Sequence, residues 1–269
     1  MHILITNIVS IRFSIKQSTL ICIKTSVFSK KGRIIGGQNT DTTDFPYQAL
    51  LKRISNDQLI CGAAIISHFH IITTAHCVDK NIDSHDNIKI IVGNFNSSSY
   101  TGITYYPNKI FIHTEYTGNL NPFNTIQNDI AIIQIKGYME FSKFISKIKL
   151  ATENIIDGNI GVFVGWGSTY FPNIVHSVFL QKIWVTIINN KKCQDVYPGI
   201  YADQFCGIQH RGIGPCFGDG GGPLISVGKL VGLISLSNPC AEGIPDVYTS
   251  IYYHLKFIKF ILYNVGQSD

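Results

Sequence analysis

The sequence has few charged residues and no long apolar run. Only 14% of its 269 residues are Asp, Glu, Lys or Arg, whereas 45% are hydrophobic. A chain of this composition buries a core and does not stay disordered. No uncharged apolar stretch reaches the 18 residues of a membrane-spanning helix, and internal repeats and low-complexity linkers are absent. The length fits one large domain or two closely joined ones.

Acidic residues are missing from residues 1–33, which hold six of the 22 Lys and Arg residues. Without this segment the chain has 16 basic and 17 acidic residues, a net charge of −1. The body is therefore not predicted to bind nucleic acid or a membrane. We interpret 1–33 as a leader, either a signal peptide, a propeptide or both. Its apolar run is broken by polar residues, and its lack of acids is also typical of a transit peptide.

The seven cysteines lack the C-x₂-C pairs that are typical of zinc sites. They are Cys22, Cys61, Cys77, Cys193, Cys206, Cys216 and Cys240. Taken two by two from Cys61 onward, they lie 16, 13 and 24 residues apart, which predicts three local disulfides and an oxidising compartment. Six cysteines allow 15 pairings, so spacing alone does not fix the partners. The alternative is a reduced intracellular protein with buried thiols.

From residue 34 onward the pattern is that of an all-β protein. Short β-branched runs are separated by Gly, Asn, Pro and Ser, as in a sandwich or barrel. The predicted strands are 88–92, 130–135, 160–164, 182–188, 224–227 and 230–235. One helix is predicted at about 250–262, where Ser250 can cap a run of apolar residues at helical spacing.

Four short motifs follow one another along the chain, and each is weak alone. They are Arg33-Ile34-Ile35-Gly36-Gly37, Thr73-Thr74-Ala75-His76-Cys77, Asn128-Asp129-Ile130-Ala131 and Gly218-Asp219-Gly220-Gly221-Gly222-Pro223. A lone His is commonly structural, and an Asp before a strand is commonly a turn residue. The glycine-rich turn lacks the Lys-Ser/Thr of a phosphate-binding loop. Their order and spacing together make a chance match very improbable.

The set resembles the chymotrypsin/trypsin family of serine proteases, from Ile34 to about Leu262. Supporting matches are Cys61-Gly62, Gly165-Trp166-Gly167 and Pro245-Asp246-Val247-Tyr248-Thr249. The resemblance implies two six-stranded Greek-key barrels, at about 34–148 and 149–249, with the site in the cleft between them and a C-terminal α-helix. It also implies the disulfides Cys61–Cys77, Cys193–Cys206 and Cys216–Cys240.

In that family a His takes the proton of a serine hydroxyl, and a buried carboxylate orients the His. His76 and Asp129 match these two positions. The serine belongs in the middle of Gly-Asp-Ser-Gly-Gly-Pro, where this chain has Gly220. Glycine has no oxygen to attack a carbonyl, so no acyl-enzyme can form there. Losing this nucleophile costs about 10⁶ in turnover. The alternative explanations for Gly220 are a deliberate knock-out or a sequencing error.

Other parts of the family's machinery are retained. Cleavage after Arg33 would free the Ile34 ammonium to form an ion pair with Asp219, and the amides of Gly218 and Gly220 match the oxyanion hole. The competing interpretation is that Ile34 and Asp219 are kept only for the stability of the fold, because a buried and unpaired Asp219 would cost several kcal/mol.

The substrate pocket departs from the family pattern. Trypsins carry an Asp six residues before the serine, where this chain has Gly214 and then Pro215. A preference for Arg or Lys is therefore not expected. Asp246 replaces a family Gly and either restores a negative charge, fills the pocket or lies solvated in a loop. The usual Ser-Trp-Gly is here Ser235-Leu236-Ser237, which removes an aromatic wall and adds a side chain at the opening.

These features predict a secreted, catalytically inactive serine protease homologue that acts by binding a protein. The resemblance extends to the inactivated paralogues of mite group 3 allergens and implies a partner from a protease cascade such as complement, immunity or clotting. We expect a monomer without cofactor or metal, since no acid between residues 93 and 106 is available to hold calcium. One alternative is a weak or specialised endopeptidase, with Ser235 as the nearest substitute nucleophile. Another is a relic without a partner.

Overall fold

The computed structural model describes residues 34–79, 85–93, 96–97, 102–118, 125–237 and 240–265. The chain divides into the units 1–31 and 32–269, and every described residue belongs to the second. The predicted leader, with Cys22 and Arg33, lies outside the described residues. Among the helices of the described part, none is long and apolar enough to cross a membrane.

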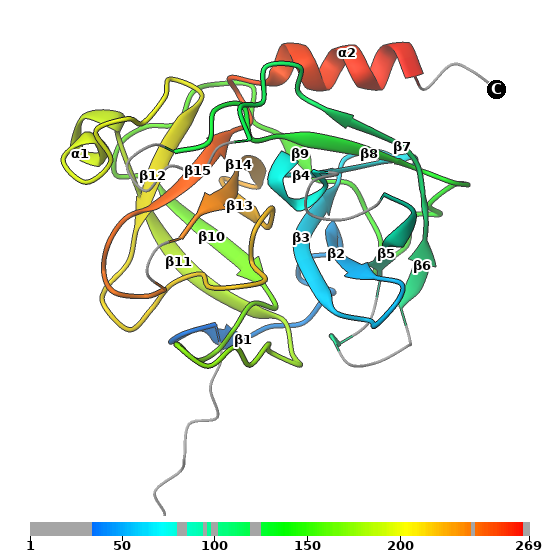
Figure 1. Ribbon diagram of the computed structural model, residues 1–269, viewed down its shortest axis with the longest axis horizontal. Coiled ribbons are helices and arrows are strands. Elements are labelled where there is room, and N and C mark those ends of the chain that lie inside the picture. The colour runs from blue at the N-terminus through cyan, green and yellow to red at the C-terminus, as the bar shows by residue number, and fades with distance from the viewer. Residues whose placement is uncertain are drawn as a thin grey trace, which may run out of the picture. The chain divides into compact units, whose positions relative to one another are not determined.

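The first barrel-like sheet has seven antiparallel strands in the order β6-β5-β2-β3-β4-β8-β7 (Figure 1). Their bounds are β2 Gln48–Arg53, β3 Leu59–Ile65, β4 His70–Thr73, β5 Ile88–Val92, β6 Ile103–Tyr105, β7 Pro107–Ile112 and β8 Ala131–Ile135. Only Tyr106 separates β6 from β7, although these strands stand at opposite ends of the order. The sheet therefore curls round until its two ends meet in one stretch of chain.

The second sheet closes on itself through six strands in the order β10-β13-β14-β15-β12-β11, because β11 pairs with both β10 and β12. The bounds are β10 Ile160–Gly165, β11 Gln181–Ile188, β12 Gln204–Ile208, β13 Pro223–Ser226, β14 Lys229–Leu236 and β15 Asp246–Ser250. Two short strands, β1 Gln38–Asn39 and β9 Lys149–Leu150, add to it. Residues near the start of the described chain thus join the second sheet and not the first.

Alternation along the strands places the core. In β11 the residues at every second position from Gln181 to Ile187 are buried, while Trp184 is half exposed, as expected for a strand with one face toward a barrel interior. Phe163, Phe205 and Tyr248 fill that interior. The fold is the predicted trypsin-like pair of β barrels with few helices.

All six predicted strands are present, with bounds shifted by no more than two residues. The C-terminal helix α2 begins later than predicted, at Leu255, and ends at Val265. Ser250 ends β15, where it pairs with Gly232, and its hydroxyl accepts from the Tyr253 amide at 3.3 Å, so it caps the turn at 251–254 that leads into α2. A second helix, α1 Asn190–Gln194, was not predicted. The Asn189 side chain caps it by accepting from the Lys192 amide.

The three disulfides are Cys61–Cys77, Cys193–Cys206 and Cys216–Cys240. They confirm the pairing that the family resemblance implied. The first and third lie beside the candidate site, where they fix the turns that carry His76 and Gly220.

Candidate active site

His76 and Asp129 meet because of the pairing of two strands. His76 lies in a short 3₁₀ turn (η1, Ala75–Cys77) just after β4, and Asp129 lies just before β8. In the antiparallel β4–β8 pair, Thr73 stands opposite Ala131, so the two flanking turns are neighbours. The His76 Nδ1 atom lies 2.7 Å from Asp129 Oδ2, and the His76 amide donates to Oδ1 at 2.9 Å.

The Asp129 carboxylate is fully buried and holds further partners. The Ser235 hydroxyl donates to its Oδ2 at 2.6 Å, and the Thr249 hydroxyl donates to the Asp129 carbonyl at 2.9 Å. Ser235 is therefore engaged with the carboxylate that orients His76. A hydroxyl that donates to an ionised carboxylate is not aimed at a substrate carbonyl, which weighs against Ser235 as a substitute nucleophile.

The pKa of His76 is set by two opposing influences. Burial disfavours the imidazolium, but the adjacent Asp129 carboxylate outweighs burial through its charge and hydrogen bond, and the pKa of His76 is raised above its usual value. The pair is thus a base held by a carboxylate, which is the arrangement that acid–base chemistry at this position requires.

Gly220 stands directly in front of this base. A Cβ atom built on Gly220 would lie 2.8 Å from His76 Nε2 and 3.3 Å from Cys61 Sγ. The position predicted for the nucleophile therefore faces His76, and the imidazole ring occupies part of the space that a side chain would need. Gly220 has only its Cα methylene at this point and no hydroxyl.

The turn before Gly220 contains the amide predicted for the oxyanion hole. Gly218 has φ +91°, a left-handed conformation that favours glycine. A Cβ at this residue would lie 2.9 Å from the His176 ring and 2.8 Å from Leu59 Cδ2. The close approach of these two side chains therefore requires glycine at residue 218.

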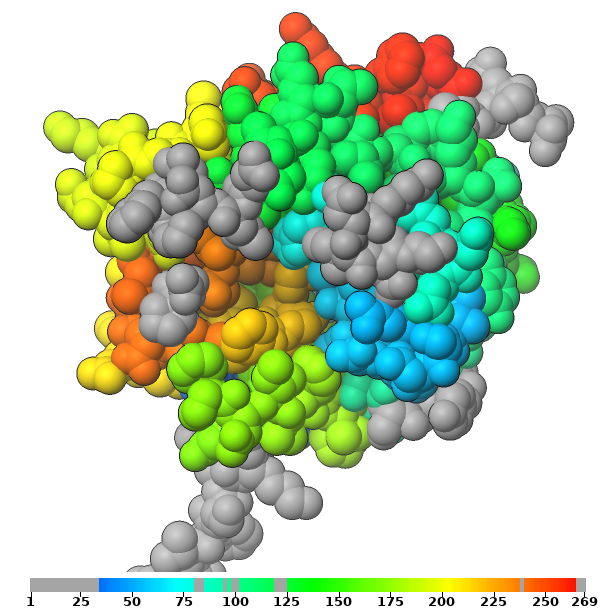
Figure 2. All heavy atoms as spheres, in the orientation of Figure 1, coloured from blue at the N-terminus to red at the C-terminus, as the bar shows by residue number. Residues whose placement is uncertain are grey.

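A cleft of about 300 Å³ surrounds His76 and the glycine turn. Apolar side chains dominate its walls, among them Ile60, Ile126, Phe217 and Leu236. Figure 2 shows a hollow between the yellow-to-orange surface of the second barrel and the blue-to-cyan surface of the first. Ser235, Leu236 and Ser237 line this cleft as predicted, but Gly214, Pro215 and Asp246 do not.

The predicted specificity pocket is bridged. The Ser237 hydroxyl donates to the Pro215 carbonyl at 3.0 Å, so a hydrogen bond joins two segments that would form opposite walls. Behind it, a Cβ on Gly214 would lie 3.1 Å from the Ala241 Cα atom, which leaves no room for a longer side chain there. No motif in the sequence signals this bridge.

Asp246 is not a solvated loop residue. It is the first residue of β15, where it pairs with Gly207 and is 3% exposed. Burial raises the pKa of Asp246 to about 8. Hydrogen bonds from Ser237 and Gln209 act in the opposite direction, but their effect on the pKa is smaller than that of burial. At pH 7 most of this carboxyl is therefore protonated, and it supplies little negative charge to a basic substrate.

Asp219 is buried within the second barrel, where its carboxylate packs against Gly165 and Gly167. It accepts hydrogen bonds from the amides of Gly167 and Cys216 at 2.8 and 3.0 Å, and burial raises its pKa to about 7. The Ile34 side chain lies in the core of the same barrel. In the uncleaved sequence the Ile34 nitrogen is an uncharged amide, and the ion pair between a freed Ile34 ammonium and Asp219 remains a prediction for the cleaved form.

One group of potential metal ligands occurs among the described residues: Cys61, His76 and Cys77 have their ligand atoms within 4.8 Å of one another. The two sulfurs form a disulfide. A disulfide sulfur is not a thiolate, and thiolates are what zinc binds. The cluster therefore does not fit a metal.

Two β barrels, with a His–Asp pair on the first facing a glycine turn on the second, define the architecture of a serine-type peptidase domain. The family model described as Trypsin matches residues 34–258, and the chain belongs to the trypsin family. It is 34% identical over 225 residues to Trypsin delta of Drosophila melanogaster, covering 82% of this chain and 85% of the relative. It is 29% identical over 227 residues to Chymotrypsin-2 of Vespa crabro, covering 84% and 98%.

A solved structure with similar architecture is that of the scabies mite inactivated protease paralogue S-D1. The TM-score is 0.76 at 26% identity, with 86% of this chain and 97% of the other covered. The family assignment and the fold predicted from the motifs are thereby confirmed. The Ser237–Pro215 bridge, the His176 ring against Gly218 and the exposed apolar side chains of residues 170–179 were not predicted from the sequence, because none of these belongs to a motif.

Proposed function

We propose that this trypsin-family protein is a secreted, catalytically inactive homologue that binds a polypeptide in and beside its cleft. The observation that carries the proposal is Gly220 in front of His76 Nε2, where a nucleophile would need a hydroxyl. The Ser237–Pro215 bridge and the buried Asp246 support it, because the bridge crosses the predicted pocket and the protonated carboxyl of Asp246 does not replace the negative charge that Gly214 lacks. The three disulfides support export to an oxidising compartment.

An exposed apolar surface at the rim of the cleft supports binding as the activity. We call it the apolar rim. Its members are Tyr170, Phe171, Ile174, Val175, Val178, Phe179 and Phe217, each 41–59% exposed. Monomeric proteins rarely leave so many large apolar side chains together at the surface unless a partner covers them. Figure 2 shows the yellow-green surface around this loop at the lower edge of the hollow.

The apolar rim is continuous with the cleft and is held in place. Phe217 lines the cleft and also stacks on Phe171, with ring centroids 6.3 Å apart. The Ser168 side chain ties the loop together by accepting from the Val175 amide at 3.0 Å and donating to the Tyr170 carbonyl at 2.7 Å. Residues 168–179 contain no Asp, Glu, Lys or Arg. The occupant that fits is a polypeptide segment with bulky uncharged side chains, and we propose a protease-cascade or host-defence protein as its source.

The catalytic half of the proposal is tested with a broad peptide library and mass spectrometry. The chain is processed after Arg33, incubated at high concentration and compared with a His76→Ala variant. We expect no cleavage that depends on His76. Reproducible cuts that vanish in His76→Ala would overturn the proposal in favour of a residual endopeptidase, for which the intact His76–Asp129 pair would be the base.

The binding half is tested with the same library under conditions that retain bound peptides. We expect enrichment of peptides with adjacent bulky apolar residues, and loss of that enrichment in the double variant Phe171→Ser/Phe217→Ser. Phe260→Ser is the matched control, because Phe260 is 63% exposed on α2 and lies outside the apolar rim. Equal enrichment in the double variant and the control would contradict a role for the rim.

A further inference from the structure

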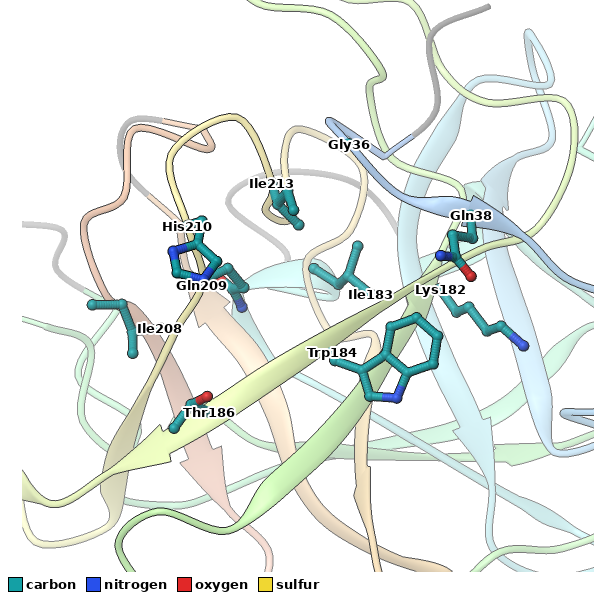
Figure 3. Close-up of a pocket in the computed structure, with 10 residues that line it drawn as sticks. All are labelled: Gly36, Gln38, Lys182, Ile183, Trp184, Thr186, Ile208, Gln209, His210 and Ile213. Atoms are coloured by element: carbon teal, nitrogen blue, oxygen red, sulfur yellow. The ribbon is translucent and has the colours of Figure 1, made fainter. Parts of the chain in front are cut away.

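The outer face of the second barrel carries a cavity that no part of the proposed function uses. Along β11 the residues Lys182, Trp184 and Thr186 alternate with buried ones and so face away from the barrel interior. Thr186 pairs with Ile208 of β12, and Lys182 pairs with Gln38 of β1. These strands form the base of a cavity of about 420 Å³ (Figure 3). Not one residue of its lining also lines the cleft around His76.

Backbone contacts hold one side of this cavity in place. Gly36 has φ +74°, and a Cβ there would collide with the Gly212 carbonyl and with Ile213. The Gly214 amide also donates to the Ile35 carbonyl at 3.1 Å. The segment before β1 is thus fastened to the loop after β12, and Figure 3 shows Gly36 and Ile213 together at that side. The cavity is therefore preformed, and its size lies within the range typical of small-molecule sites, roughly 300–1,000 Å³.

The lining combines an aromatic surface with a lysine ammonium and several hydrogen-bonding groups. The Trp184 side chain is 50% exposed, although indole is among the side chains that gain most from being covered. Ile208 and Ile213 extend the apolar surface, and the amide of Gln38 and the hydroxyl of Thr186 add hydrogen-bonding groups.

The charge of the lining favours an anion. None of the ten described residues that line the cavity is acidic, and only Lys182 among them is a lysine or an arginine. Its ammonium lies 5.9 Å from the centroid of the Trp184 ring. A flat ring stacked on the indole would therefore place an attached anionic group within reach of Lys182, where an ammonium and a carboxylate form a charge-assisted hydrogen bond.

We propose that this cavity is a binding site for a small aromatic carboxylate, with the ring stacked on Trp184 and the carboxylate held by Lys182. The site is separate from the proposed polypeptide-binding cleft, so the two proposals stand or fall independently. Lys182 supplies the selectivity for charge, whereas Trp184 and the two isoleucines supply the apolar contact area.

The test uses 1-naphthylacetate and its neutral analogue 1-naphthylacetamide as probes, with isothermal titration calorimetry on the full chain. We expect the acid to bind about tenfold more tightly than the amide, since a charge-assisted contact is the difference between them. Lys182→Gln should weaken binding of the acid by about tenfold and leave binding of the amide unchanged, whereas Trp184→Ala should weaken binding of both probes. Lys256→Gln, an exposed lysine of α2, is the matched control and should change neither.

Location is read separately from affinity. The chain has two tryptophans, and Trp166 is buried while Trp184 is half exposed. The two indole N–H signals in a nitrogen-15 correlation spectrum are assigned with Trp184→Ala, and the probe should shift the Trp184 signal alone. Equal affinity for acid and amide, unchanged binding in Lys182→Gln, or an unshifted Trp184 signal would each overturn the proposal, as would the absence of binding at millimolar probe.

Discussion

The buried carboxyl of Asp246 should make the stability of this protein fall as pH rises. Burial raises the pKa of Asp246 to about 8 in the folded chain, whereas an unfolded chain has the ordinary value of 3.8. Between these two values the folded state holds a proton that the unfolded state has lost. Stability rises with pH where the unfolded state binds more protons, so here it falls. The contribution is fully present below pH 3.8 and is lost by about pH 8.

The magnitude follows from the part of this window that an experiment can cover. From pH 5 to pH 8 the folded and unfolded states differ by about one proton, which corresponds to about 4 kcal/mol. Relaxation around the ionised carboxylate lowers the cost, and we expect a measured change of about 2–4 kcal/mol. Asp246→Asn keeps the shape and removes the proton, so the variant should gain stability relative to the parent by this amount as pH rises.

Urea unfolding at pH 5, 6.5 and 8, with the disulfides oxidised, measures the difference. Taking the difference between parent and variant removes the contributions of titrating groups that do not interact with Asp246, whereas Asp219, whose charge raises the pKa of Asp246, contributes to the difference with the same sign. Asp157→Asn is the control without a pH trend, because a hydrogen bond from Lys192 lowers the pKa of Asp157 and its carboxylate is ionised in both the folded and the unfolded chain from pH 5 to pH 8. A difference between Asp246→Asn and the parent that stays constant over this range, or that moves in favour of the parent at pH 8, would refute the burial argument. Asp246→Gly also removes the carboxyl but adds no amide, so its free energy of unfolding should change with pH as that of Asp246→Asn does. Agreement between the two variants shows that the effect comes from the lost proton and not from the new amide.

Two further perturbations test the site itself. Gly220→Ser should restore labelling by a fluorophosphonate probe only slowly, because its Cβ would lie 2.8 Å from His76 Nε2 and the imidazole ring must move first. Rapid labelling together with cleavage after Arg or Lys would show that the pocket was never remodelled. Cleavage after Arg33 should raise the melting temperature more at pH 8 than at pH 5, since an ammonium paired with Asp219 lowers a pKa that burial raises to about 7. Equal shifts in differential scanning calorimetry at both pH values would exclude that pair.

Six strands were predictable from sequence because β-branched runs report on local backbone preference and burial together, whereas strands without such a run, such as β2 and β12, were not predicted. The start of α2 was not, since Ser250 caps a turn at 251–254 and the helix itself begins only at Leu255, a delay that no residue pattern signals. Helix α1 has no apolar periodicity. It depends on the Asn189 cap and on the disulfide of Cys193, which is a tertiary contact.

The candidate site divides in the same way. His76, Asp129 and Gly220 were predictable because their neighbours form motifs whose order a family preserves. The burial of Asp246 was left open, because only its pairing with Gly207 in β15 removes it from solvent. The Ser237–Pro215 bridge joins residues 22 positions apart across a pocket. Such a contact is set by the spacing of two walls, which a sequence does not display.

The persistence of His76 and Asp129 carries little information about catalysis. Asp129 is fully buried and accepts hydrogen bonds from the His76 ring, the His76 amide and Ser235. Removing the His would leave a buried carboxylate with fewer partners, at a cost of several kcal/mol, so folding alone is sufficient reason to keep the pair. No such reason applies to the apolar rim, because exposed side chains such as Phe179 contribute little to the core. Under the proposed function a polypeptide partner covers these side chains, and on that proposal the rim is a better guide to function than the remnant of the triad.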